Sequence, residues 1–440
     1  MKNSNWTCLR PGWAFVPAAA LCIWGLMAGG GYSRAAQGQA EASASETTAY
    51  LDYHPSQTVA SSYGLPLTFE LQSKAFRKEP NTARRTVVRG NLRFGSTVVS
   101  NARATAGTSE EDQRIACLWD VTQGKLYVDL NRNGDLTDDP AGVYSYPVPT
   151  LSRAVSTYQN FSNVRLNFKT PAGDHPLAVD LMFYNSSSRP QITATSRSYW
   201  GGKVSLQGRD WQVGIMDGFN GKVPSPDGGQ LLLRPWEEQG RAVQATVDSL
   251  EVIPYYQNLF FGGTAYRLET VFENQDGTPK YKVVFKERPV ELGELVLAGK
   301  YVRRLLLTAN EARQTQPRYT VLVDNPSATN KVPVGTYAQC RVQLQTSGGV
   351  QVSTDSMGVA PLLHTPVVGS STQPVMLKAG GPLTNVVKVT SQGRNLRLDY
   401  QLVSADGRSC RLSPEDRSKP PEWVVSQNGK TIASGKFEYG

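Results

Sequence analysis

The stretch Val164–Phe168, with the sequence VRLNF, alternates apolar and polar residues, and this pattern decides the fold class. A second stretch of the same kind, YRLETVF, spans Tyr266–Phe272. A period of two residues puts successive side chains on opposite faces of a β-strand, so each stretch predicts a strand with one packed and one solvated face. Such strands are typical of antiparallel sheets.

Similar β-rich strings, separated by turn signals, recur from about residue 51 to 300. They include LPLTFELQS, TVVRGNLRFG, LAVDLMFY, WQVGIMD, QLLLRPW and YKVVFKE. The turn sequences PAGD at Pro171 and NQDG at Asn274 favour hairpins. No alternation of strand and helix patterns supports a parallel α/β fold. The chain is therefore predicted to be all-β, with an antiparallel sheet or sandwich over residues 51–300.

Residues 301–440 are predicted to form a further β-domain. After an ambiguous stretch from about residue 287 to 310, which fits two strands or a strand with a helical turn, β-rich strings return at about ten-residue spacing. Asn428-Gly429 is the strongest two-residue hairpin signal. Seven short strands in this region resemble an immunoglobulin-like β-sandwich by pattern, although the Cys and Trp spacing of true immunoglobulin domains is missing.

The N-terminal residues have the layout of a secretory signal peptide. Residues 1–36 contain no acid, carry Lys2 and Arg10, and include the apolar run Trp13–Gly31. Retention of this run as a membrane anchor is the alternative, and lipidation at Cys22 is disfavoured because Leu21 precedes it. Small and polar residues at 37–50 predict a flexible leader. An exported protein, periplasmic, cell-surface or secreted, follows from this interpretation.

The charge balance argues against a nucleic-acid partner. Removing Lys2, Arg10 and Arg34 with the signal leaves 43 basic residues against 37 acidic ones. The remaining basic residues are scattered, so no basic stripe is evident. After signal removal no other stretch is apolar enough to span a membrane. Polysaccharide or envelope components are the partners that this composition allows, and it does not predict the oligomeric state.

The stretch 129–140, DLNRNGDLTDDP, is the one place where the sequence carries a recognisable site. Oxygen donors alternate along it around a Gly turn at Gly134, a spacing that suits calcium because this ion takes six to eight oxygen ligands. The stretch resembles the calcium loop of EF-hand and dockerin modules over about a dozen residues, which implies a structural calcium ion. The expected ligands are Asp129, Asn131, Asn133, Asp135, Asp138 and Asp139.

The loop departs from that family in two respects. Position twelve, which normally closes the calcium shell with an acid, is Pro140, so Asp138 or Asp139 has to replace it. The preceding GKLYVDL predicts a strand and not a helix. An affinity of about 0.1–1 mM is expected, and a plain polar turn is the alternative. A second loop after a strand, at residues 217–227, resembles the first less closely and is better explained as a Gly-rich turn.

Cysteine and histidine offer little chemistry. Once Cys8 and Cys22 leave with the signal, three cysteines remain, so at most one intramolecular disulfide forms, with Cys340 and Cys410 as the preferred pair. Cys117, in the apolar string IACLW, is predicted to be a buried free thiol. The three histidines are far apart in sequence, which disfavours a zinc site; they are His54, His175 and His364.

Two functions remain open. No metalloprotease, nucleophile-elbow, P-loop or dinucleotide-binding motif is present, so a calcium-stabilised β-protein with a binding or structural role is favoured over an enzyme. The alternative is a glycan-active hydrolase, because its paired acids leave no local motif. Two aromatic clusters are candidates for stacking on sugars, with core packing as their ordinary role. They comprise Tyr199, Trp200, Tyr255, Tyr256, Phe260 and Phe261.

Overall fold

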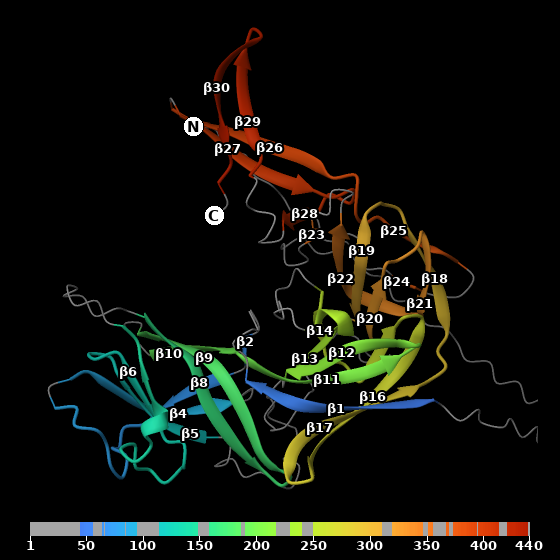
Figure 1. Ribbon diagram of the computed structural model, residues 1–440. Helices are drawn as coiled ribbons and strands as arrows, with labels where there is room; N and C mark the ends of the chain where they lie inside the picture. The colour runs from blue at the N-terminus through green and yellow to red at the C-terminus, as the bar shows by residue number, and fades with distance from the viewer. Residues whose placement is uncertain are drawn as a thin grey trace, which may run out of the picture. The chain divides into compact units, whose positions relative to one another are not determined.

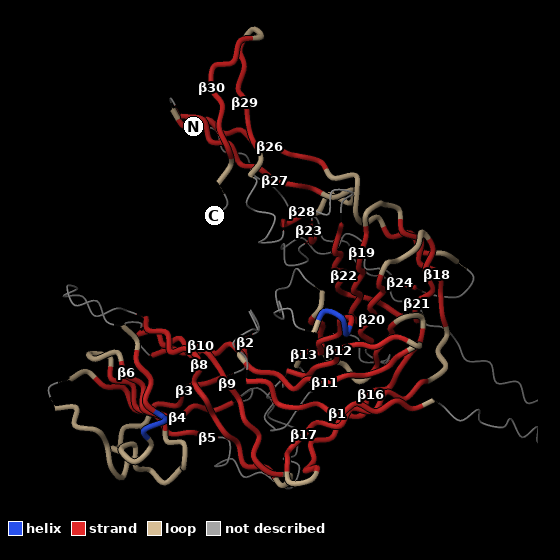
Figure 2. The backbone as a smooth tube through the Cα atoms, viewed as in Figure 1, coloured by secondary structure: helices blue, strands red, loops and turns tan. Residues whose placement is uncertain are grey.

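The computed structural model describes fifteen stretches of the chain. They are residues 45–55, 64–65, 67–83, 85–94, 114–147, 158–185, 190–216, 229–239, 250–309, 319–345, 351–354, 367–368, 373–393, 395–412 and 420–438. These stretches contain strands and two short 3₁₀ turns, η2 (Pro140–Gly142) and η3 (Trp236–Glu238), and no α-helix (Figure 2). The all-β prediction is confirmed. Within the same stretches no helix has the length and apolarity to cross a membrane.

The largest sheet has 16 strands, of which 15 follow one path. Most neighbours are antiparallel, and β15 and β20 are a parallel pair. The path runs through β14 (Val252–Pro254), β13 (Gln230–Pro235), β12 (Arg209–Met216), β11 (Ser198–Leu206), β1 (Glu46–Pro55), β17 (Thr278–Glu287), β16 (Thr264–Gln275), β15 (Asn258–Phe261), β20 (Tyr319–Asp324), β19 (Val302–Ala309), β22 (Gly335–Gln345), β23 (Gln351–Thr354), β28 (Ser409–Leu412), β27 (Asn395–Val403) and β26 (Thr384–Gln392), with β24 (Val367–Val368) beside β22. The sheet includes strands from both sides of residue 300.

Strand β1 joins two parts of this sheet. Its first half pairs with β17 and its second half with β11 (Figure 1). It begins at Glu46, so the last five residues of the predicted leader are strand. The reason is local: Ala49 and Leu51 are buried and Tyr50 is exposed, which is the two-residue period of a strand. The rest of the leader and the predicted signal lie outside the described residues.

Two smaller sheets share one core. The five-stranded sheet contains β3 (Leu67–Leu71), β4 (Val87–Phe94), β5 (Arg114–Asp120), β6 (Lys125–Val128) and β7 (Val143–Ser145). The four-stranded sheet contains β2 (Gly64–Leu65), β10 (Pro190–Ser196), β9 (Gly173–Asn185) and β8 (Tyr158–Thr170), the last two forming a long hairpin (Figure 1). Val164, Leu166 and Phe168, the apolar residues of VRLNF, are all buried in this core with Trp119. The alternation therefore predicts the packed face of β8 correctly.

The remaining strands form a three-stranded sheet and a hairpin. The sheet contains β21 (Thr329–Pro333), β18 (Leu292–Leu297) and β25 (Val375–Leu377), and the hairpin contains β29 (Glu422–Gln427) and β30 (Lys430–Lys436). Because β18 and β19 follow each other, the ambiguous stretch from residue 287 to 310 holds two strands. Asn428 and Gly429, with φ of 50° and 76°, connect the hairpin as predicted.

Candidate functional site

The candidate calcium loop connects β6 to β7, two antiparallel neighbours of the five-stranded sheet. Strand β6 ends at Val128, and the backbone N–H of Asp129 still donates to the Ala116 carbonyl of β5 at 2.9 Å. A strand leads into the loop, as the sequence predicts. Because Asp129 is 2 % exposed, the first acid of the loop is fixed at the sheet edge by both backbone pairing and burial.

A series of side-chain to backbone hydrogen bonds curls the loop. The two Asp129 carboxylate oxygens accept from the backbone N–H groups of Asn133 (3.2 Å) and Gly134 (2.9 Å). Asn131 Oδ1 accepts from Asn133 N–H at 3.0 Å, and Asn133 Oδ1 accepts from Asp135 N–H at 2.6 Å. Such Asx turns are why Asn and Asp suit tight loops, and the positive φ of Gly134, 77°, is open to glycine without strain.

The two acids at positions ten and eleven have different partners. The Asp138 carboxylate accepts from Asn131 Nδ2 at 3.2 Å and from Asn133 Nδ2 at 2.7 Å. Asp139 Oδ2 instead accepts backbone N–H groups, from Leu130 at 2.9 Å and from Asn131 at 3.4 Å. The side chains of Asp138, Asn131 and Asn133 therefore converge, whereas Asp139 holds the loop backbone.

The carboxylate of Asp135, the seventh residue of the loop, contacts Thr137 and Lys78. Its Oδ1 accepts from the backbone N–H (2.9 Å) and hydroxyl (2.6 Å) of Thr137, and Lys78 Nζ lies 3.5 Å from Oδ2. The hydrogen bonds from Thr137, with smaller help from Lys78, lower the pKa of this carboxyl. Position seven of the resembled loops gives its backbone carbonyl to the ion, and the backbone carbonyl is therefore the Asp135 group that we count as a donor.

The chain before β4 fastens the loop from outside. Lys78 N–H donates to the Gly134 carbonyl at 3.2 Å, and Leu136 N–H donates to the Lys78 carbonyl at 3.0 Å. Leu136 is 2 % exposed and packs with Leu118 and Tyr127. The sequence pattern did not point to Lys78, because a contact 50 or more residues away leaves no local signal; the apolar Leu136 inside a polar loop was the only hint of anchoring.

Only some of the oxygen donors that the loop offers to a cation are carboxylates. Among the described residues, no three Asp, Glu, His or Cys side chains are grouped so as to hold a metal ion. The loop instead offers two carboxylates, of Asp129 and Asp138, the two Asn amides between them and the Asp135 carbonyl. Calcium accepts amide and backbone carbonyl oxygens as readily as carboxylates, so this set fits calcium better than zinc. The second loop, at residues 217–227, lies outside the described residues.

The two described histidines lie in different surroundings. His54 Nε2 lies 3.2 Å from the Gly201 carbonyl, and its ring stacks on Tyr199. His175 is 1 % exposed among Trp200, Phe272 and other aromatic rings. His364 lies outside the described residues.

Burial of His175 predicts an acid-sensitive fold. Burial lowers the pKa of this ring from 6.5 to about 3. Below pH 6.5 the unfolded chain gains a proton here that the native state refuses until about pH 3, so stability is full above pH 6.5 and falls as the pH falls. By pH 5 the loss is about 2 kcal/mol. Urea unfolding at pH 6.5 and at pH 5 measures this loss of stability. The loss should be smaller in His175→Phe than in the native protein, and an equal loss in the two proteins would contradict the prediction.

The predicted cysteine pair is wrong. Cys117, Cys340 and Cys410 are all buried free thiols. Strand β23 lies between β22, which carries Cys340, and β28, which carries Cys410. Two steps of about 4.8 Å between strands exceed the roughly 7 Å limit between bridged Cα atoms. The prediction for Cys117 is confirmed, and burial raises the pKa of its thiol.

Five of the six aromatic residues considered for sugar stacking are core residues, and Tyr256 is partly buried. Tyr199 and Trp200 are 8 % and 3 % exposed, and Tyr255, Phe260 and Phe261 are each 2 % or less. Trp200 and Tyr255 belong to the main core of the large sheet. Core packing, their ordinary role, is therefore what the structure shows at these five positions, and the sugar-stacking alternative does not hold there.

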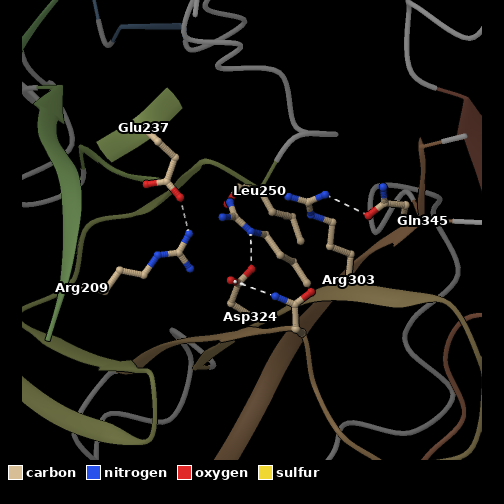
Figure 3. Close-up of polar contacts among 8 residues, drawn as sticks. Arg209, Glu237, Leu250, Arg303, Asp324 and Gln345 are labelled. Atoms are coloured by element: carbon tan, nitrogen blue, oxygen red, sulfur yellow. Dashed lines mark hydrogen bonds and ion pairs between the residues drawn. The ribbon is translucent and has the colours of Figure 1, made fainter. Parts of the chain in front are cut away.

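Buried ion pairs form a separate group of polar contacts between strands. Arg304 of β19 faces Asp324 of β20 across the sheet, with 2.9 Å between Nε and Oδ1, and it also donates to the Leu250 carbonyl at 3.4 Å. Figure 3 shows the Asp324 carboxylate at one end of this ion pair. Arg304 is 4 % exposed, so the group stabilises the packing and presents no reactive atom to a substrate.

Comparisons with known proteins add no relative. No protein-family model matches the chain, no curated protein matches its sequence, and no solved structure matches its fold.

Proposed function

We propose that the loop 129–139 binds one structural calcium ion and that the protein is an exported, calcium-stabilised β-protein with a binding role. One observation supports the ion site: the Asp138 carboxylate meets the side chains of Asn131 and Asn133, in the loop that begins at the buried Asp129. A cation at this point takes the place of the two amide N–H donors. Asn131 Oδ1 and Asn133 Oδ1 each accept one backbone N–H and keep a second lone pair for the ion.

Asp138, and not Asp139, is the acid proposed to close the shell in place of Pro140. Its carboxylate already faces the side chains of positions three and five, whereas the Asp139 carboxylate is engaged by the backbone of Leu130 and Asn131. The expected affinity is about 0.1–1 mM, the range of extracellular calcium modules. Calcium would fasten β6, β7 and the segment around Lys78 to one another.

Calcium is expected to raise the melting temperature by a few degrees. At about 10 mM calcium and this affinity, mass action adds about 1.4–2.7 kcal/mol to the native state. Differential scanning calorimetry after EDTA treatment, with and without added calcium, measures the shift. Asp138→Asn should abolish it, whereas Asp139→Asn, the same change one residue away, should keep it.

Isothermal titration supplies a second measurement. Heat of calcium binding should appear in the native protein and disappear in Asp129→Ala. The ion proposal is overturned if the native protein shows neither heat nor a melting shift, and the choice between the two acids is overturned if Asp139→Asn alone loses the shift. A magnesium titration controls for weak screening by divalent ions.

Three further parts of the hypothesis stay predictions. Export depends on residues 1–36, and localisation of a tagged full-length chain tests it. The immunoglobulin-like sandwich of residues 301–440 needs a second sheet facing the strands β19, β20 and β22, which belong to the large sheet. The glycan-active hydrolase is tested by measuring new reducing ends when the protein is incubated with polysaccharides.

A further inference from the structure

The outer face of the four-stranded sheet carries an exposed aromatic pair. Tyr158 of β8 and Tyr184 of β9 are direct cross-strand partners and are 53 % and 42 % exposed. Met182, two residues before Tyr184 on the same face, is 40 % exposed. Directly opposed side chains on one face have Cβ atoms about 5 Å apart, so the two rings and the thioether form one apolar surface.

This face is not the one that builds the core. The residues between the exposed ones, Gln159 and Phe161 on β8 and Leu181 and Phe183 on β9, are 1 % exposed or less. Strand alternation therefore divides the sheet into a packed side and an outer side, with β8, β9 and β10 next to one another (Figure 1). Large apolar side chains gathered on an outer face mark an interaction surface.

The neighbours of the aromatic pair are neutral and polar. Gln191 of β10 lies opposite Tyr184, while Asn160 and Thr193 lie opposite Met182 on its two sides, and all three are exposed. Amide and hydroxyl groups both donate and accept hydrogen bonds. The acid that comes next on this face, Asp180, is bound by Arg197 at 2.7 Å and by the backbone N–H of Asn163 at 2.9 Å.

We propose that this tyrosine platform, made of Tyr158, Asn160, Met182, Tyr184, Gln191 and Thr193, binds a neutral polysaccharide. A sugar ring presents an apolar C–H face, which stacks on an aromatic side chain, and a rim of hydroxyls, which meets the amides and the threonine. The platform holds no unpaired charge to attract an acidic glycan or a nucleic acid. A protein partner would need about 800 Å² on each side, and the apolar part here consists of three side chains.

The platform is independent of the calcium loop, because the two use different strands and different chemistry. The test uses the full chain and five insoluble polysaccharides: cellulose, chitin, starch, xylan and a β-1,3-glucan. At least one should retain the native protein. Tyr158→Ala and Tyr184→Ala should each weaken retention about tenfold, since each loses a stacking contact, and Tyr184→Trp should keep it. Tyr50→Ala removes a 40 % exposed Tyr from β1 in the large sheet and should change nothing.

Three results would overturn the proposal. They are failure of all five polysaccharides to retain the native protein, equal retention of Tyr184→Ala with a native circular dichroism spectrum, and a Tyr184→Ala variant that turns a dimer into a monomer in sedimentation, which would assign the surface to a second copy of the chain. Asp138→Asn should be retained like the native protein, so that a failed calcium experiment and a failed sugar experiment are distinguished.

Discussion

Replacing Arg234 with Met is expected to lower the free energy of unfolding by about 3–5 kcal/mol. Arg234 is 0 % exposed; its Nε donates to Gln212 Oε1 at 2.7 Å, its Nη2 to the Gln239 carbonyl at 3.1 Å, and its Nη1 lies 3.6 Å from Glu251 Oε2. Glu251 is 5 % exposed, so the variant leaves a buried carboxylate without this counter-charge. Urea unfolding followed by circular dichroism measures the loss.

The double variant Arg234→Met/Glu251→Leu separates charge from packing. If the cost comes from the Glu251 carboxylate that has lost the Arg234 charge, removing this carboxylate should recover most of the lost stability, because apolar residues of similar volume often replace a buried ion pair at little cost. Arg209→Met serves as the matched control: the Arg209–Glu237 pair (Figure 3) is exposed, and its loss should cost much less. Equal losses in Arg234→Met and Arg209→Met would contradict the prediction.

Replacing Trp119 with Ala is expected to cost about 3–5 kcal/mol, through the cavity that it opens. The side chain is fully buried, its ring lies 5.1 Å from that of Phe183, and its Nε1 donates to Gln159 Oε1 at 2.6 Å. Gln159, itself 0 % exposed, would also lose a partner for its carbonyl oxygen. Because Trp119 joins the five-stranded and four-stranded sheets, amide hydrogen exchange should accelerate in β5 and β9 together.

Trp119→Phe is the graded control for this core. It keeps most of the apolar volume and removes the hydrogen bond, so an intermediate cost of about 1–3 kcal/mol is expected. A loss below about 1 kcal/mol in Trp119→Ala, or faster exchange in β5 alone, would show that the two sheets do not depend on this side chain.

Local sequence patterns predict the strands well, but they do not predict which faces of the strands other segments bury. The alternation of Val164–Phe168 and the Asn428-Gly429 turn depend on neighbours in sequence, and both are confirmed. Tyr199 is buried by strands and segments distant in sequence, and the partners of β1 follow 143 or more residues later, so neither stretch alone shows what covers it or what pairs with it.

The candidate calcium loop also has features that local sequence predicts and features that it does not. The spacing of Asp129, Asn131 and Asn133 identified the loop, since these residues bond to one another within five positions. The different partners of Asp138 and Asp139 required three-dimensional geometry, because two adjacent acids are equivalent in sequence. The tyrosine platform combines strands β8, β9 and β10, so no single stretch carried its signal.

The double pairing of β1 has a consequence for how the chain is made. This strand is synthesised early, yet its partners at β11 and β17 end at Leu206 and Glu287. At about 5–20 residues per second, roughly 230 further residues take about 10–50 s to emerge. Both edges of this β-forming segment stay open until β11 has emerged, and the edge that pairs with β17 stays open to other nascent chains for the whole of that time. A chaperone that holds residues 46–55 until then would raise the yield of folded protein, and a Lys in place of the exposed Tyr50 should reduce aggregation during refolding.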